Sequence, residues 1–228
     1  MDTQYGLIFD VDGVVADTEP LNARVTIRIL DEMFGIAGAR PEDFADGFGR
    51  GAEEYVKAGA KTHGVELTDE QAHEATGLRE QRLIESLRRE PLPAFPGVLE
   101  LMEAGLADPP FRVAIATSAT QETSRAILES AGVPYERMAW VSGSEVSRKK
   151  PDPEIFLKAA RKIDLPAARC VVFEDAPSGV QAARAAGTRC IAVTNTVEPA
   201  ELSAADRICA SLEEIDLPTV RALIDPSS

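Results

Sequence analysis

Cysteine is scarce in this chain: its 228 residues include only Cys170, Cys190 and Cys209. Their number is odd, they lie in apolar or mixed segments, and no two are closely paired. Neither a disulfide framework nor a cysteine metal site is therefore expected. Buried thiols in a reducing cytoplasm are the interpretation that fits them.

Basic residues are also few relative to acidic ones. The chain has 24 Lys and Arg against 38 Asp and Glu, which gives a formal net charge of −14 and a pI near 4.6. This charge argues against nucleic acid or an anionic membrane surface as a partner. Any site for a phosphorylated ligand must then be locally basic or assisted by a metal ion.

Long apolar runs are lacking as well. No run reaches the length that spans a membrane, and the first residues lack the charged-then-apolar pattern of a signal sequence. Yet 44% of the residues are hydrophobic, enough to bury a core in one large domain or a domain with an insertion. We expect a soluble, cytoplasmic protein. Its oligomeric state is open, with a monomer favoured.

What is present is an alternation of short apolar runs and amphipathic segments after residue 94. Repeated strand–helix units with short loops predict an α/β fold with a Rossmann-like, doubly wound parallel sheet. Residues 18–93 show only helical periodicity, so we predict a core domain of residues 1–17 plus 94–228 and an inserted all-α cap domain of residues 18–93. The expected strands are 7–9, 112–116, 138–141, 170–173, 190–193 and 207–209; the expected helices are 21–34, 55–63, 69–89, 98–106, 121–131, 153–163, 180–186 and 219–224, with a short one from 199.

Polar residues follow three of the predicted strands. They are Asp10 and Asp12 after the first strand, Thr117 and Ser118 after the second, and Glu174 and Asp175 after the fourth. The ends of parallel strands meet at one edge of the sheet, where open α/β sheets bind their ligands. Two like charges as close as Asp10 and Asp12 need a shared proton or a cation between them, and Mg²⁺ is the natural hard cation.

A fourth polar group, residues 148–152, lies in a loop before a helix and contains Lys150. Together the four groups hold a nucleophile, an acid/base residue, hydroxyl donors and a cation, the inventory for metal-assisted phosphoryl transfer through an aspartyl-phosphate. Each has a simpler alternative. Asp10 and Asp12 could form a turn, Thr117 could cap a helix, Lys150 could belong to a solvated basic cluster, and Glu174 with Asp175 could cap the next helix.

Four motifs in this order resemble the haloacid dehalogenase superfamily, and within it the β-phosphoglucomutase and sugar-phosphate phosphatase group with a helical cap. They are FDVDGVVADTE (9–19), IATS (115–118), KPDP (150–153) and VFEDAPSGV (172–180). The resemblance implies that Asp10 is the nucleophile and Asp12 the general acid and base. It further implies that Asp10, Asp12 through its carbonyl, Asp175 and nearby Glu174 hold Mg²⁺. Thr117 and the Ser118 amide would then bind a phosphoryl oxygen, and Lys150 would neutralise its charge.

The signal is thinner in the predicted cap. Arg50 lies in a glycine-rich turn where similar proteins place an arginine that contacts the substrate, and Glu19 and Asn22 follow the first motif at positions that face substrate in relatives. The mutase pattern prefers His at the position of Asn22, which favours hydrolysis of a sugar phosphate over a phosphomutase. A phospho-accepting signalling module, a non-catalytic interaction protein and a dehalogenase fit the motifs less well.

Overall fold

The computed structural model describes residues 4–47 and 49–225. In these residues a six-stranded parallel sheet has the order β3-β2-β1-β4-β5-β6, which confirms the predicted doubly wound α/β fold. Its strands are β1 (Tyr5–Phe9), β2 (Phe111–Ala116), β3 (Ala139–Val141), β4 (Cys170–Glu174), β5 (Arg189–Val193) and β6 (Arg207–Cys209). The helices are α1 (Glu19–Phe34), α2 (Ala52–Thr62), α3 (Asp69–Arg89), α4 (Val98–Ala107), α5 (Gln121–Ser130), α6 (Glu154–Lys162), α7 (Pro177–Ala186) and α8 (Leu217–Ile224).

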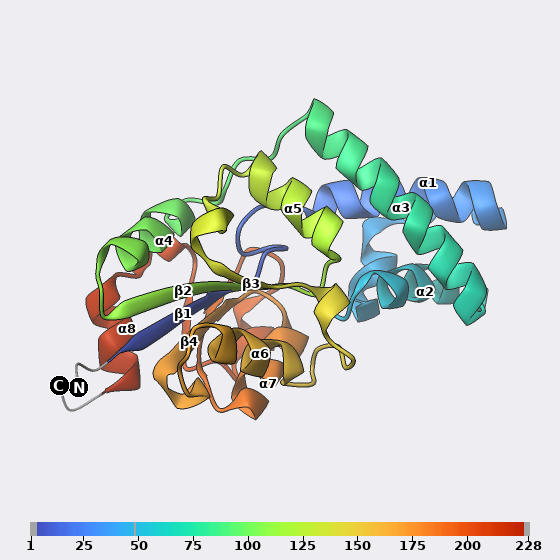
Figure 1. Ribbon diagram of the computed structural model, residues 1–228. Coiled ribbons are helices and arrows are strands. Elements are labelled where there is room, and N and C mark those ends of the chain that lie inside the picture. Colours follow the sequence, from blue (N-terminus) through green and yellow to red (C-terminus); the bar gives the residue numbers. More distant parts are fainter. Residues whose placement is uncertain (1–3, 48, 226–228) are drawn as a thin grey trace.

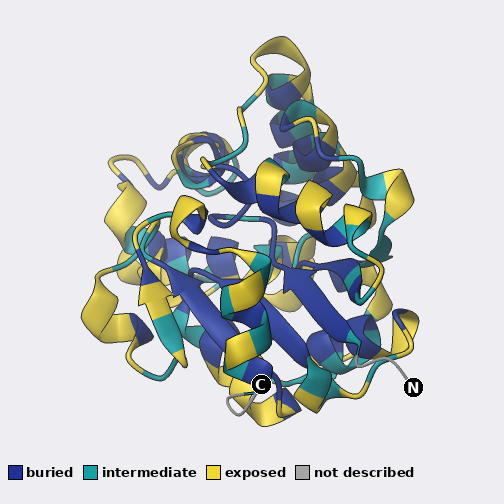
Figure 2. Cartoon of the chain, turned by 90° about the vertical axis from the view of Figure 1, so that its left-hand side faces the viewer, coloured by how far each residue is buried: buried dark blue, intermediate teal, exposed yellow. Residues whose placement is uncertain are grey.

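Both faces of the sheet are covered because neighbouring residues of each strand point to opposite sides. Leu7 and Phe9 of β1 belong to one buried cluster, shared with α4, α5 and α8. Ile8, between them, belongs to a second cluster shared with α6 and α7. In Figure 2 the strands are therefore buried along most of their length, whereas the helices carry exposed residues on their outer sides.

The stretch between β1 and α4 is helical, as its periodicity predicts. It contains α1, α2, α3 and a short 3₁₀ helix at Pro41–Gly47. α3 begins after Thr68. A threonine followed three residues later by glutamine predicts a capping box, and the side chains of Thr68 and Gln71 form one. These helices pack on one another beside the edge of the sheet at which β1 and β2 end (Figure 1).

The two segments that join the helical stretch to the sheet lie side by side. Ala16 and Ala94 form an antiparallel bridge, and the amide of Phe95 donates to the carbonyl of Val15 at 2.8 Å. The chain therefore leaves the sheet and returns to it at nearly the same place. None of the helices in the described part of the chain is long and apolar enough to cross a membrane.

Candidate active site

The three polar strand ends converge because β1 lies between β2 and β4. The register pairs Phe9 with Ile115 on one side and with Phe173 on the other. Asp10, the next residue, continues the ladder by donating its amide to the carbonyl of Phe173 at 3.0 Å. The side chains that follow β1, β2 and β4 thus share one edge of the sheet, facing α1–α3.

Asp10 is paired with Lys150, 140 residues away in sequence. Lys150 Nζ lies 2.7 Å from Asp10 Oδ1, and both residues are buried, with exposed fractions of 3% and 5%. Burial raises the pKa of Asp10 to about 8, against the opposing charge of Lys150. Burial alone would lower the pKa of Lys150, but the charges of Asp10 and Glu174 outweigh it and raise that pKa.

Glu174 joins Lys150 to the turn after β4 through hydrogen bonds. One carboxylate oxygen accepts from Lys150 Nζ, and the other accepts the backbone amides of Asp175 at 2.9 Å and Ala176 at 3.0 Å. A Cβ on Gly179 would collide with this carboxylate at 1.8 Å, so glycine is required where α7 passes it. Since both oxygens of Glu174 are engaged, it supports Lys150 and the turn after β4.

Asp175 completes a group that fits a divalent cation. Among residues 4–47 and 49–225, Asp10, Glu174 and Asp175 are buried with one oxygen of each within 4.8 Å of the others. Burial, then the charges of Glu174 and Asp10, raises the pKa of Asp175 well above its ordinary value. When ionised, these three carboxylates carry three negative charges, and among the described residues only the Lys150 ammonium group pairs with them. A hard cation with oxygen ligands would balance the remaining negative charge.

Asp12 does not belong to that carboxylate group, although we predict it among the metal ligands. Its side chain accepts a hydrogen bond from Thr18 at 2.7 Å and lies 3.5 Å from the hydroxyl of Thr117. Thr117 is fully buried and accepts from the amide of Ala119 at 3.1 Å. Asp12 thus points toward the start of α1, and a contribution of its carbonyl to metal binding stays a prediction.

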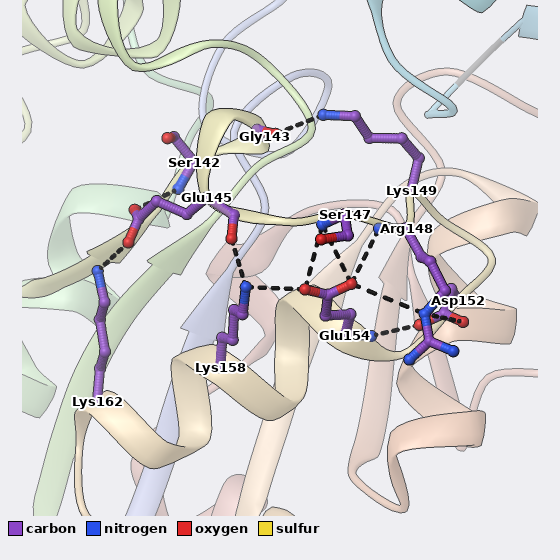
Figure 3. A network of polar contacts seen from close by, with 10 residues as sticks. All are labelled: Ser142, Gly143, Glu145, Ser147, Arg148, Lys149, Asp152, Glu154, Lys158 and Lys162. Atoms are coloured by element: carbon purple, nitrogen blue, oxygen red, sulfur yellow. Dashed lines mark hydrogen bonds and ion pairs between the residues drawn. The ribbon is translucent and has the colours of Figure 1, made fainter.

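Lys150 comes from a loop that a dense polar network ties to α6 (Figure 3). Glu154 in the first turn of α6 accepts the amides of Ser147 at 3.2 Å and Arg148 at 2.9 Å. Glu154 also pairs with Lys158 at 2.8 Å, and these contacts lower its pKa to about 2, the hydrogen bond from Lys158 being the largest cause. The residue before Lys150, Lys149, donates to the carbonyl of Gly143.

A cavity of about 90 Å³ separates the sheet edge from α1–α3, and Glu19, Asn22 and Ser118 line it together with Asp10 and Asp12. Asn22 is buried, and Glu19 accepts a hydrogen bond from the Tyr55 hydroxyl. Ser118 donates its hydroxyl to the carbonyl of Gly49 at 3.1 Å, which joins the end of β2 to the turn before α2.

Arg50 lies elsewhere. It is exposed, donates to the carbonyl of Asp46 at 3.3 Å, and lines a second cleft with Lys57 and Lys61 on the outer side of α2. Arg50 is not among the described residues that line the first cavity. Its side chain leaves the glycine-rich turn toward the second cleft instead.

The cationic side chain in the cavity wall facing α1 is Arg79 of α3, a residue that the motifs do not single out. It is 6% exposed; Nη2 lies 2.7 Å from Asn22 Oδ1 and Nε lies 3.0 Å from Thr26 Oγ1. Its guanidinium stands 5.2 Å from the centre of the Tyr55 ring. A signal exists in the sequence, since Arg79 takes its place in the buried stripe of α3 formed by Ala72, Ala75, Thr76, Leu83 and Leu87.

Comparison with known proteins places this arrangement in a family. Residues 6–187 match the haloacid dehalogenase-like hydrolases. The chain belongs to that family. The match includes the three polar strand ends, the Lys150 loop and the helical stretch.

Individual relatives differ in how much of their length the chain spans. It is 36% identical over 197 residues to SUPPRESSOR OF QUENCHING 1, chloroplastic, of Arabidopsis thaliana, covering 86% of this chain but only 18% of that protein. It is 30% identical over 223 residues to hexitol phosphatase A of Escherichia coli, covering 92% of each. The fold of β-phosphoglucomutase from Clostridium difficile superposes with a TM-score of 0.84 at 16% identity, over 98% of each chain.

Proposed function

We propose that this haloacid dehalogenase-like hydrolase is a Mg²⁺-dependent phosphatase for a small phosphorylated metabolite, a sugar phosphate. The observation that carries the proposal is the buried pair of Asp10 and Lys150, 2.7 Å apart, which lines the cavity together with Asp175. The 30% identity to a hexitol phosphatase over nearly the whole chain supports the substrate class.

In the first step, Asp10 attacks phosphorus and the ester P–O bond breaks, so the phosphoryl group is transferred to the carboxylate. Asp12 gives its proton to the departing alkoxide oxygen. In the second step Asp12 takes a proton from water as that water attacks phosphorus, which releases inorganic phosphate and restores Asp10. Lys150 and the donors around Thr117 and Ser118 stabilise the negative charge of the transferring group.

Asp10 and Asp175 are the side chains that would hold Mg²⁺, because the oxygens of Glu174 already accept hydrogen bonds. When bound, the ion neutralises the charge of the phosphoryl oxygens. Asp12 remains outside this set and accepts from Thr18, which keeps its carboxyl group available for proton transfer.

Residues 18–93 would act as a cap over the sheet edge. The pairing of Ala16 with Ala94, where the chain leaves and re-enters the sheet, supports this division. Side chains from both the sheet edge and the cap helices α1–α3 line the cavity. Substrate would therefore enter when the cap helices move away and react after they close.

The first test is phosphate release from a panel of sugar and sugar-alcohol phosphates, with Mg²⁺ and with chelator, alongside detection of isomerised product. We expect release that requires Mg²⁺ and vanishes in Asp10→Asn. Asp17→Asn makes the same change at an exposed carboxylate near the end of the same motif and should retain activity. Metal-dependent hydrolysis by Asp10→Asn would refute the mechanism, and isomer without phosphate release would identify a phosphomutase instead.

The compartment is a further part of the proposal. The cysteines at 170, 190 and 209 are free and buried, which supports a reducing cytoplasm as the place where the protein works.

A further inference from the structure

The cavity has few cationic groups. Its described lining contains four carboxylates but only two cations: the former are Asp10, Asp12, Glu19 and Asp175, and the latter are Lys150 and Arg79. Lys150 is enclosed between Asp10 and Glu174 at the catalytic end. Among the described lining residues, Arg79 is thus the cation that could bind the part of a substrate that extends away from Asp10.

The charge of Arg79 is already balanced. Its guanidinium donates to Asn22 and Thr26. The carboxylates of Asp12, Glu80 and Glu19 each favour its charged form, and its charge in turn favours the ionised form of Glu19. Tyr55 links the two, since its hydroxyl donates to Glu19 while its ring lies against Arg79. We call the wall formed by Glu19, Asn22, Tyr55 and Arg79 the distal wall. When Glu19 is ionised, its charge and that of Arg79 cancel, and the distal wall carries no net charge.

A neutral distal wall discriminates between substrates. A second phosphate brings a charge of about −1.5 to −2 at pH 7, and it would be desolvated beside the Glu19 carboxylate without a cation of its own. A hydroxyl group is uncharged and can both donate to a carboxylate and accept from a guanidinium. The distal wall offers one partner of each kind.

We propose that the substrate is a monophosphate whose remainder is an uncharged polyol, and that Glu19 is the residue that selects against a second phosphate. This inference rests on the proposed phosphatase function and narrows its substrate class. It also bears on the mutase alternative, because a mutase that works through a sugar bisphosphate must hold a second phosphate at this wall.

The test uses matched pairs: fructose 1-phosphate with fructose 1,6-bisphosphate, glucose 6-phosphate with glucose 1,6-bisphosphate, and ribulose 5-phosphate with ribulose 1,5-bisphosphate. Each kcat/KM is measured with Mg²⁺ at pH 8, where Glu19 is ionised. In the pair whose monophosphate reacts fastest, we expect kcat/KM for the monophosphate to exceed that for the bisphosphate at least tenfold. A bisphosphate that reacts as well as its partner, or better, would overturn the inference.

Glu19→Gln then tests the assigned residue. The amide keeps an oxygen that accepts from Tyr55 but removes the charge, so Arg79 is left uncompensated and the preference should narrow at least threefold. Glu53→Gln, an exposed change nearby on α2, should leave the ratio unchanged. An unaltered ratio in Glu19→Gln would exclude the role of Glu19. Absence of hydrolysis with every phosphate ester in both panels would instead refute the phosphatase function itself.

Discussion

Glu19 shows how the environment of one side chain sets its chemistry. It is half-buried in the distal wall, where burial raises its pKa to about 7 against the hydrogen bond from Tyr55 and the charge of Arg79. Asp12 and Asp17 add to the increase. The folded protein thus holds a proton on Glu19 more tightly than the unfolded chain, in which the ordinary value of 4.5 applies.

Glu19→Gln should therefore stabilise the substrate-free protein in a pH-dependent way. The stabilisation that wild-type Glu19 gains from its bound proton is complete below pH 4.5 and is lost as the pH rises through 7. Glutamine does not titrate, so the variant has no such loss of stability between pH 5 and pH 8. Its free energy of unfolding should therefore exceed that of the wild type by more at pH 8 than at pH 5, the difference being up to about 2 kcal/mol. Denaturant unfolding at the two pH values measures this. An equal effect at both, or the same trend in Glu53→Gln, would contradict the assignment.

The loop before α6 shows how a helix positions Lys150, the residue that we propose to stabilise the transferring phosphoryl group. The backbone amides of Ser147 and Arg148 donate hydrogen bonds to the Glu154 carboxylate. Glu145 further anchors the loop, because its carboxylate accepts from the amide of Ser142 at 3.1 Å and from Lys162 at 2.6 Å (Figure 3). α6 thereby holds the loop whose Lys150 reaches Asp10. Displacement of a catalytic group by about 1 Å can reduce a rate by two orders of magnitude.

Glu154→Ala should consequently lower kcat about tenfold with little change in KM, because Lys150 acts on the transferring phosphoryl group. Glu154→Gln keeps an oxygen that accepts from the loop amides and should recover part of the loss. Arg148→Gln removes a side chain that pairs with Asp152 and Glu154 but leaves the backbone amide, so it serves as the control. Hydrogen exchange at Ser147 and Arg148 should accelerate only in Glu154→Ala; faster exchange with unchanged kcat would refute the positioning role.

At the scale of the whole molecule, one contact joins the turn before α2 to the ends of β2 and β4. Gly49 has φ of +69° and accepts from Ser118. A Cβ at this position would approach Ser178 Oγ to 2.5 Å and Ala176 Cβ to 3.2 Å. A larger residue would therefore be strained at this position, where the turn lies against the ends of both β2 and β4.

Gly49→Ala should disfavour closure and reduce kcat/KM several-fold beyond any effect of backbone strain. Gly64→Ala is the matched control, since Gly64 has φ of +75° and a methyl group added there would meet no described atom within 4 Å. Both variants bear the cost of alanine in a left-handed conformation, about 1–2 kcal/mol, and should lose similar thermal stability. Equal kcat/KM in the two variants would show that the Gly49 contact does not govern closure.

Local pattern accounts for most elements of this fold. Helical periodicity and the Thr68 capping box predict α3 with the observed bounds, and the edge strand expected at 207–209 is β6. Elsewhere the ends shift by a few residues, as for α7, which begins at Pro177 rather than 180. These features are encoded by neighbouring residues, because hydrophobic period and capping act within a few positions of the chain.

The catalytic edge follows from the same local information together with one topological rule. Asp10, Thr117 and Asp175 each come directly after an apolar strand, and parallel strands end on one side of a sheet. The amino-acid sequence was therefore sufficient to bring together the residues that we propose for phosphoryl transfer and to recognise the family. It was also sufficient to predict a helical stretch between β1 and α4.

The distal wall needed long-range packing. Arg79 stands in a helix rich in both charges, and it becomes buried only because α3 packs on α1 and meets Asn22 and Thr26, 57 and 53 residues away. Arg50, with a similar side chain in a glycine-rich turn, ends in solvent. Which arginine reaches the cavity depends on how α1, α2 and α3 cross, and no short segment of the chain encodes that crossing. The tertiary structure therefore also decides which charges the distal wall presents to the proposed substrate.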